Sequence, residues 1–269
     1  MVAAPIGNLE DLTLRASRVL KEADLIAAED TRRTRQLLSH LGIKARVVSY
    51  REQNQAKTTP KLIEALLSGK DLALITDAGT PALSDPGHRL VRAAHQAGVK
   101  VVPVPGPSAL VAALSVCGLP AARFFFTGFL PAKKGPRRKY LEELAGRTET
   151  LVFFEAPHRL KASLKDLAEI LGPREAVLAR ELTKLNEEVR FSNLAELAEG
   201  TEALVKGEVT LVVAGLDQPA SQADQKTIRR VWLKWRGQGL SASQAAREAA
   251  RELRLAKAKV YRLVQEDDS

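Results

Sequence analysis

The sequence predicts two α/β domains with a cleft between them, followed by a small helical module. Three observations lead to this prediction. Runs rich in β-forming residues alternate with helical patterns as far as Gly215, which is the element order of α/β proteins. Gly118-Leu119-Pro120 interrupts the alternation, and the polar stretch Asp217–Asp224 separates it from a purely helical remainder. We therefore expect an N-terminal α/β domain over 1–118, a second over 119–217 and a helical module over 225–269.

Each α/β domain is expected to hold short strands where apolar and β-branched residues concentrate. In the first domain these are Ala23–Ala28, Arg46–Tyr50, Asp71–Thr76 and Val99–Val104, and in the second they are Phe124–Phe129, Thr150–Glu155, Ala176–Arg180 and Val209–Ala214. Helices are expected over Asp85–Gly98 and His158–Leu171, because their apolar residues recur at the spacing of one helical face. The linker at Gly118 is short, so we expect little independent motion of the two domains.

The remainder of the chain is expected to resemble a helix-turn-helix. Small and apolar residues repeat every four positions over Ala245–Leu253, and a break near Arg254–Ala256 precedes a second apolar set. Two short helices joined by a tight turn fit this pattern. Lysine and arginine surround Trp232 and Trp235, which favours docking to RNA. The alternative is a dimerisation or packing module with the tryptophans in its core.

The composition favours a polyanionic partner. The formal net charge is +9 and the pI is about 9.7, and lysine and arginine release the counterions condensed on phosphates. The sequence has no apolar run of about 18 residues and no export signal at its start, so we expect a cytoplasmic protein that does not span a membrane. Its single cysteine, Cys117, excludes an internal disulfide and is expected to be buried.

Three turns rich in glycine and proline follow predicted strands or strand remnants: Pro5–Leu9, Asp77–Pro81 and Pro103–Ala109. Ligands of open α/β sheets bind outside the carboxyl ends of the strands, so these turns are expected to form one site. The sequence has neither the dinucleotide fingerprint nor a nucleotide-triphosphate loop. Its four histidines and one cysteine lack the spacing of metal ligands, and we expect no metal.

These turns and several further motifs carry a resemblance to a known family. The motifs are Pro5–Leu9 with Glu10-Asp11, Ala28–Arg32, Thr76–Pro81 with Ser84–Gly87, Pro105–Ala109, Gly128–Pro131, Glu155–Arg159, Ala179–Lys184 and Gly207-Glu208. In this order and spacing they resemble the tetrapyrrole-methylase superfamily, and within it the bacterial family that methylates a cytidine 2′-hydroxyl of 16S ribosomal RNA. The resemblance covers nearly the whole chain.

The resemblance implies a methyltransferase without the usual Rossmann site, in which S-adenosylmethionine lies between two α/β domains. It implies cofactor contacts from Asp77, Ala78, Gly79, Thr80, Pro105, Gly106, Pro107, Ser108, Ala156 and Ala179. It implies substrate contacts from Pro5, Gly7, Asn8, Glu29, Arg32, His158 and Arg159. The implied partners are ribosomal RNA near the decoding centre of the small (30S) subunit and a second copy of the chain.

The chemistry calls for positioning and for a base. Methyl transfer from a sulfonium is an in-line displacement, so holding the ribose oxygen close and collinear supplies much of the acceleration. A base would remove the hydroxyl proton, and the candidates are Asp30, Asp85 and Glu155. Arg180 or Lys184 could stabilise developing oxyanion charge.

Each candidate has a structural alternative. Asp85 could be the N-cap of the helix Asp85–Gly98, and Glu29-Asp30 could cap a helix that starts near Thr31. Glu155 could pair with Arg159, and His158 could orient or cap. The sequence leaves the identity of the base open.

Basic residues gather at the start of the second domain, where Lys133, Lys134, Arg137, Arg138 and Lys139 follow a strand end with no acid among them. We expect this basic run to form a loop that holds RNA phosphates; the alternative is a solvated face. Two other functions stay open. One is a methyltransferase with a tetrapyrrole acceptor, and the other is a non-catalytic RNA-binding assembly factor, which would bind RNA without S-adenosylhomocysteine.

Overall fold

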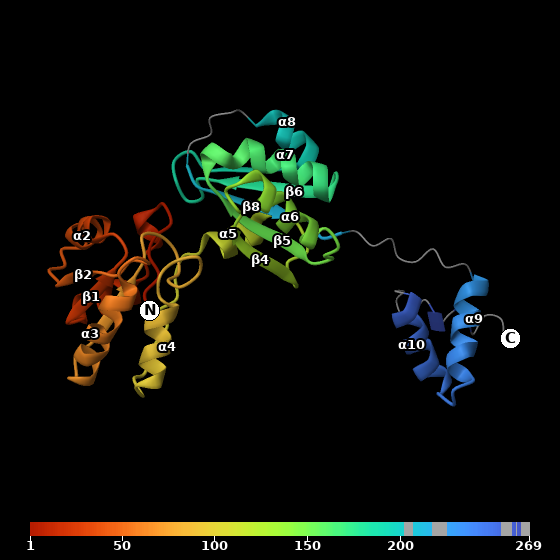
Figure 1. The fold of residues 1–269 in the computed structure, drawn as a ribbon, viewed down its shortest axis with the longest axis horizontal. Coiled ribbons are helices and arrows are strands. Elements are labelled where there is room, and N and C mark those ends of the chain that lie inside the picture. The colour runs from red at the N-terminus through yellow and green to blue at the C-terminus, as the bar shows by residue number, and fades with distance from the viewer. Residues whose placement is uncertain (202–206, 217–224, 254–259, 262, 265–269) are drawn as a thin grey trace. The chain divides into compact units, whose positions relative to one another are not determined.

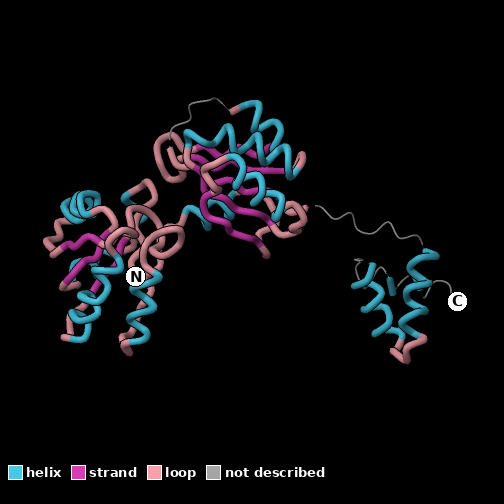
Figure 2. Tube along the Cα trace, viewed as in Figure 1, coloured by secondary structure: helices cyan, strands magenta, loops and turns pink. Residues whose placement is uncertain are grey.

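The computed structural model describes residues 1–201, 207–216, 225–253, 260, 261, 263 and 264. It divides the chain into two compact units, Met1–Leu216 and Asp217–Ser269. The first unit holds two separate sheets, which fall on either side of Gly118 (Figures 1 and 2). The domain boundary expected at Gly118 stays a prediction.

The first sheet is parallel, with strand order β2-β1-β3. Its strands are β1 (Leu25–Ala28), β2 (Val47–Ser49) and β3 (Leu72–Ile75), each shorter than expected. The helices are η1 (Leu9–Asp11), α1 (Leu14–Glu22), α2 (Thr31–His40), α3 (Gln55–Leu67) and α4 (His88–Gln96). Helices α1 and α2 contribute Leu20 and Leu38 to one core with Ile26 and Ile75, whereas α3 and α4 contribute Leu62 and Leu90 to another. Apolar burial of this kind is the main stabilising force of the layer.

The strand expected over Val99–Val104 is wrong. Of these residues only Val104 pairs, in an isolated parallel bridge to Val2, which also bridges Ile75. Pro103 and Pro105 have no N–H to donate to a ladder, so pairing cannot extend on either side of Val104.

The second sheet has the order β4-β5-β8-β6-β7, and all its neighbouring strands are antiparallel except the parallel pair β4 and β5. The strands are β4 (Phe124–Phe129), β5 (Thr150–Glu155), β6 (Glu175–Arg180), β7 (Glu188–Asn193) and β8 (Val209–Val213). Sequence analysis missed β7, a half-exposed edge strand whose alternation includes charged residues.

Helices cover this sheet on both faces (Figure 2). They are α5 (Ala109–Val116), α6 (Lys134–Leu144), η2 (Pro157–Arg159), α7 (Leu160–Leu171) and α8 (Leu194–Gly200). One face packs with α6, α7 and α8 around Leu164 and Leu211. The other packs with α5 around Val212, and Ile6 from the first turn belongs to the same cluster. Cys117 is buried there, as expected.

The second unit contains α9 (Gln225–Arg236) and α10 (Ala242–Leu253), with helical residues again at 260, 261, 263 and 264. Trp232 and Trp235 pack against its small core, and the Trp232 indole N–H donates to the carbonyl of Ala242 at 3.2 Å. The predicted break near Arg254–Ala256 lies outside the described residues. Nowhere in the described chain is a helix long and apolar enough to cross a membrane.

Candidate methyltransferase site

The three glycine- and proline-rich turns meet at one place. Ala4 and Gly79 exchange backbone hydrogen bonds, with N···O distances of 2.9 and 3.0 Å. The Thr80 hydroxyl donates to the carbonyl of Pro107 at 3.3 Å, which joins the second turn to the third. Gly79 has a φ of +71°, a conformation in which a side chain is strained. The three turns therefore lie together, as expected from the sequence.

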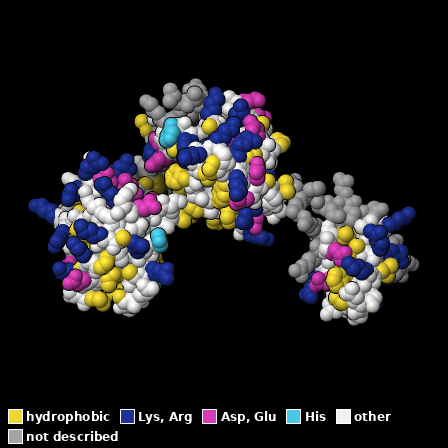
Figure 3. Space-filling model, in the orientation of Figure 1, with side chains coloured by type: hydrophobic (Ala, Val, Ile, Leu, Met, Phe, Trp, Pro, Cys, Tyr) yellow, Lys and Arg dark blue, Asp and Glu magenta, His cyan; other side chains and the backbone are white. Residues whose placement is uncertain are grey.

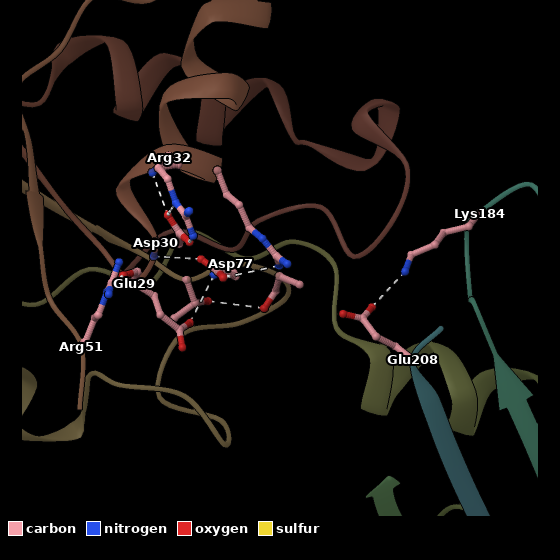
Figure 4. Close-up of polar contacts among 10 residues, drawn as sticks. Glu29, Asp30, Arg32, Arg51, Asp77, Lys184 and Glu208 are labelled. Carbon is pink, nitrogen blue, oxygen red and sulfur yellow. Dashed lines mark hydrogen bonds and ion pairs between the residues drawn. The ribbon is translucent and has the colours of Figure 1, made fainter. Parts of the chain in front are cut away.

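The first turn also contacts the loop between β6 and β7 of the second sheet. A Cβ on Gly7 would clash with Cγ of Lys184 and would lie 2.9 Å from the carbonyl oxygen of Leu182, so only glycine fits. The Thr183 hydroxyl beside it is buried and has no hydrogen-bond partner among the described residues. Lys184 Nζ lies 2.7 Å from a Glu181 carboxylate oxygen and 3.2 Å from one of Glu208 (Figure 4). Burial opposes the charge on Lys184, but these two carboxylates outweigh it and raise its pKa.

Carboxylates gather at the carboxyl ends of β1 and β3 (Figure 4). The backbone N–H of Asp30 donates to the Asp77 carboxylate at 2.9 Å, and the N–H of Asp77 donates to Glu29 at 3.4 Å. Burial raises the pKa of Glu29 above its ordinary value. Asp30 differs, because hydrogen bonds from Arg32 hold its pKa well below the ordinary value. Its carboxylate also accepts from the N–H of Arg32 and caps α2, which is the structural alternative considered for it.

Asp85 lines a cavity of about 910 Å³ at this edge. The N-cap of α4 is Gly87, so the expectation that Asp85 caps this helix is wrong. Within the described residues nothing hydrogen-bonds to the Asp85 carboxylate. Burial, followed by the charges of Glu29, Asp77 and Glu208, raises its pKa to about 7. A carboxyl group with this pKa exchanges protons near neutral pH, as a general base must.

One part of the lining of this cavity was not predicted from the sequence. It consists of Ser49 and the turn Arg51–Gln55, which follows β2. The rule that ligands bind at strand carboxyl ends applies to β2 as it does to β1 and β3, so the same signal could have found this turn.

The remaining base candidate, Glu155, is a structural residue. Its side chain is 1% exposed and pairs with Arg159 at 2.6 Å, as the alternative proposed. It also accepts from the N–H of Ala156 at 2.8 Å and from the Ser163 hydroxyl at 2.5 Å. Glu155 thus holds the turn at Ala156, beside the exposed His158. Because these contacts occupy its carboxylate, we do not propose Glu155 as the base.

Two residues expected near the reaction are held in the sheet. Ala179 is 1% exposed and its backbone sits between β7 and β8, so it supports the wall of a site instead of presenting polar groups. Arg180 pairs with Glu188 across β6 and β7 at 2.8 Å. Of the two cations considered for oxyanion charge, Lys184 is the one that contacts the first turn.

The basic run was expected to form a loop, and this is wrong, because it begins helix α6. Arg137 is buried, and its guanidinium lies 2.6 Å from Asp166, so it cannot bind RNA phosphates. Arg138 contacts Asp166 and Glu169 at 3.0 and 2.5 Å. Lys133, Lys134 and Lys139 are exposed. Lysine and arginine side chains gather over α6 and α7 on the face shown in Figure 3.

The turns fit S-adenosylmethionine. A Cβ at Gly79 would be in van der Waals contact with Ile6 Cγ2 at 3.6 Å and with the Pro107 oxygen at 3.9 Å, so the turns approach each other closely at this glycine. The Ser108 side chain does not cap α5, which leaves the first N–H groups of that helix for a carboxylate. Carboxylates nearby suit ammonium and sulfonium groups. Among the described residues no group of three or more histidine, cysteine, aspartate or glutamate side chains is placed to hold a metal ion.

Asn8 and the third turn have more limited contacts. The Asn8 side chain accepts from the N–H of Glu10 at 3.0 Å and caps η1. Pro105 and Gly106 are exposed, while Pro5, Ala78, Pro107 and Ser108 are half-buried.

Comparison with known proteins identifies the family of the chain. A profile of the family "Tetrapyrrole (Corrin/Porphyrin) Methylases" matches residues 1–198. The chain is 49% identical over 255 residues to ribosomal RNA small subunit methyltransferase I of Xylella fastidiosa, covering 93% of this chain and 92% of that one. It is 47% identical over 269 residues to the protein of the same name from Mesorhizobium japonicum, covering 97% and 89%.

Solved structures show the same fold. Uroporphyrin-III-C-methyltransferase from Thermus thermophilus is 27% identical, with a TM-score of 0.56 over 79% of this chain and 92% of that one. A diphthine synthase is 18% identical with a TM-score of 0.60 over 79% of this chain and 88% of that one, which shows the fold alone. From the matched profile and the extent of these identities, the chain belongs to the tetrapyrrole methylase family, in the group of the ribosomal RNA small subunit methyltransferases I.

Proposed function

We propose that this protein transfers a methyl group from S-adenosylmethionine to the 2′-hydroxyl of a cytidine in 16S ribosomal RNA, near the decoding centre of the small subunit. The names of its relatives support an RNA methyltransferase. Those names do not state the 2′-oxygen, the cytidine or the cofactor, which we propose in addition. We also expect a cytoplasmic homodimer, which light scattering of the purified protein would test.

The observation that carries the proposal is the charge of the 910 Å³ cavity. Five carboxylates line it, from Glu29, Asp30, Glu52, Asp77 and Asp85. Arg32 and Arg51 are its only arginine or lysine lining residues within the described chain. A tetrapyrrole that carries several carboxylates would be repelled here. A ribose and its base are uncharged, and the phosphates beside them can stay outside the cavity.

Each residue of the site then has a role. S-adenosylmethionine supplies a methyl group activated by a positively charged sulfur. The turns at Gly79 and Pro107 hold the donor, and the contact of Gly7 with Lys184 closes the edge of the site. As the 2′-oxygen gains the methyl group, its proton passes to the Asp85 carboxylate. Much of the remaining acceleration comes from the alignment of the ribose oxygen with the donor.

The reaction can be tested with a donor labelled in the methyl group. We expect label to enter 16S RNA of undermethylated small subunits and not a uroporphyrinogen-type tetrapyrrole. A methyl group on the 2′-oxygen blocks alkaline cleavage of the next phosphodiester, so the label should appear in an alkali-resistant dinucleotide. Label in mononucleotides would indicate a base methyltransferase, and label in the tetrapyrrole would favour the alternative acceptor. Binding of RNA without binding of S-adenosylhomocysteine, measured by calorimetry, would favour a non-catalytic assembly factor.

The exposed lysines of α6 should contribute to RNA affinity. Lys133 and Lys134 are exposed at the start of the helix and have no ion pair among the described residues, whereas Arg137 and Arg138 pair with Asp166 of α7. We expect Lys133→Ala with Lys134→Ala to weaken RNA binding and to reduce the slope of log affinity against log salt by about 1 to 2, since each phosphate contact contributes about 0.7 to 0.9.

A control for this variant is Lys70→Ala with Lys100→Ala. Both lysines are exposed, and Lys70 lies at the amino end of β3, the end opposite the site. The control removes the same charge but should leave most of the salt slope unchanged. Equal slopes for the two double variants would show that net charge, and not the α6 lysines, governs binding.

A further inference from the structure

The turn Arg51–Gln55 lines the same cavity as Asp85. We propose that this turn is a nucleobase subsite, in which the Glu52 carboxylate accepts a hydrogen bond from the exocyclic amino group of the acceptor base. This inference rests on the proposed function, because it places the base of the nucleotide whose ribose is methylated.

The turn is held in place by hydrogen bonds among its own residues and to the ends of β1 and β2. The N–H of Arg51 donates to the Asn54 side-chain oxygen at 2.8 Å, and the Asn54 amide donates to the carbonyl and the hydroxyl of Ser49, both at 3.2 Å. The Arg51 guanidinium donates to the carbonyl of Glu29 at 2.9 Å, which ties the turn to the end of β1 (Figure 4). Recognition of a base requires such a rigid frame, since a loose one would lose entropy on binding.

Other side chains of the turn are available to a ligand. Glu52 and Gln53 are exposed, line the cavity, and have no hydrogen bond or ion pair within the described part of the chain. The side-chain oxygen of Gln55 is buried without a partner. An unsatisfied buried amide oxygen costs free energy, and a ligand donor would relieve that cost.

These groups match the edge of an amino pyrimidine. A carboxylate accepts from the N4 amino group of cytosine, and an amide N–H can donate to a ring nitrogen or a carbonyl. Uracil has an oxygen at the position of that amino group, so it would place two acceptors against each other at Glu52. A good pair of this kind discriminates against the wrong base by about 5- to 150-fold. Glu52 would then recognise the base, while Asp85, which lines the same cavity, takes the proton of the ribose hydroxyl.

The test compares undermethylated small subunits that carry cytidine or uridine at the acceptor position. The wild-type protein should prefer cytidine in kcat/KM. In Glu52→Gln we expect this ratio to fall by about 10-fold, because a glutamine amide can pair with either base. Affinity for S-adenosylhomocysteine and the melting temperature should not change. Glu52→Ala is a second variant, which should lower activity on cytidine without improving activity on uridine.

The matched control is Glu64→Gln, since Glu64 is an exposed residue of the adjoining α3 that does not line the cavity. It should keep the wild-type ratio. If the wild-type protein methylates cytidine and Glu52→Gln keeps the same preference as Glu64→Gln, the nucleobase subsite is wrong and the proposed function stands. If the wild-type protein methylates no cytidine in the subunit, the proposed function itself is wrong.

Discussion

Replacing Asp85 with asparagine should lower kcat by about 10²- to 10⁴-fold, the usual contribution of a general base. Asparagine keeps the size and most of the polarity of the side chain but cannot take a proton. The first turn, the Gly79 turn and the Pro107 carbonyl do not involve Asp85, so the affinity for S-adenosylhomocysteine should stay close to that of the wild-type protein. Single-turnover methylation with saturating subunits would measure the loss.

The pH dependence gives a second readout of the same residue. With the pKa of Asp85 near 7, single-turnover rates of the wild-type protein should rise as the pH increases through about 7 and then level off. The groups that surround it are the carboxylates of Glu29, Asp77 and Glu208 and the cavity residues Arg32, Arg51 and His88. Asp85→Asn should remove this rise.

The contribution of Asp85 to folding stability should fall with rising pH, whereas the rate rises. Because the folded protein holds the Asp85 proton more tightly than the unfolded chain does, the stability that this proton provides is complete below about pH 4 and is lost as the pH rises through about 7. At about pH 8 the asparagine side chain of the variant carries no charge to bury, so Asp85→Asn should be at least as stable as the wild-type protein. A variant that loses rate but not stability would show that Asp85 serves the reaction and not the fold.

A matched control is Asp71→Asn, which makes the same change at an exposed carboxylate just before the amino end of β3, the end opposite the site. It should leave the rate and its pH dependence unchanged. If Asp85→Asn retained a rate within about threefold of this control, Asp85 would not be the base.

Most of the fold could be predicted because burial patterns are local. The strands β1 and β5 are short continuous buried runs, and the leucines of α7 recur at the helical period, so each was predicted within a few residues. The edge strand β7 was missed because solvent covers part of it, and its charged residues hide the alternation. The strand expected at Val99–Val104 fails because prolines flank its last residue, an effect that apolar patterning does not include.

The site was predicted less completely, because roles depend on partners that are distant in sequence. The meeting of the turns at Ala4, Gly79 and Pro107 was predicted from the rule that ligands bind at the carboxyl ends of strands, although only the Gly79 turn follows a full strand. The contacts of Arg137 and Glu155 could not be predicted in this way. Their partners Asp166 and Ser163 come close to them only after α6, β5 and α7 have packed together. A cluster of like charges in the sequence therefore separated into arginines paired with Asp166, which we call the buried clamp, and three exposed lysines.

The buried clamp leads to the largest expected effect on stability. Asp166 is 3% exposed and accepts from Arg137, itself 5% exposed, at 2.8 Å and from Arg138 at 3.0 Å. Asp166→Ala would leave the Arg137 guanidinium buried without a counter-charge. We expect the free energy of unfolding to fall by about 3 to 5 kcal/mol in a urea titration, because an uncompensated buried charge costs far more than the pair gains.

Two further variants separate the cost of an unpaired buried charge from the net contribution of the Arg137–Asp166 pair to stability. Glu169→Ala removes only the half-exposed partner of Arg138 and should cost less than about 1 kcal/mol. Arg137→Met combined with Asp166→Leu replaces both charges by apolar groups of similar length, and it should recover most of the loss, because neither charge then has to be desolvated. If Asp166→Ala and Glu169→Ala were equally mild, water would have to reach Arg137 from a side that the packing of α6 on α7 closes. The packing described for the second sheet would then be wrong at this point.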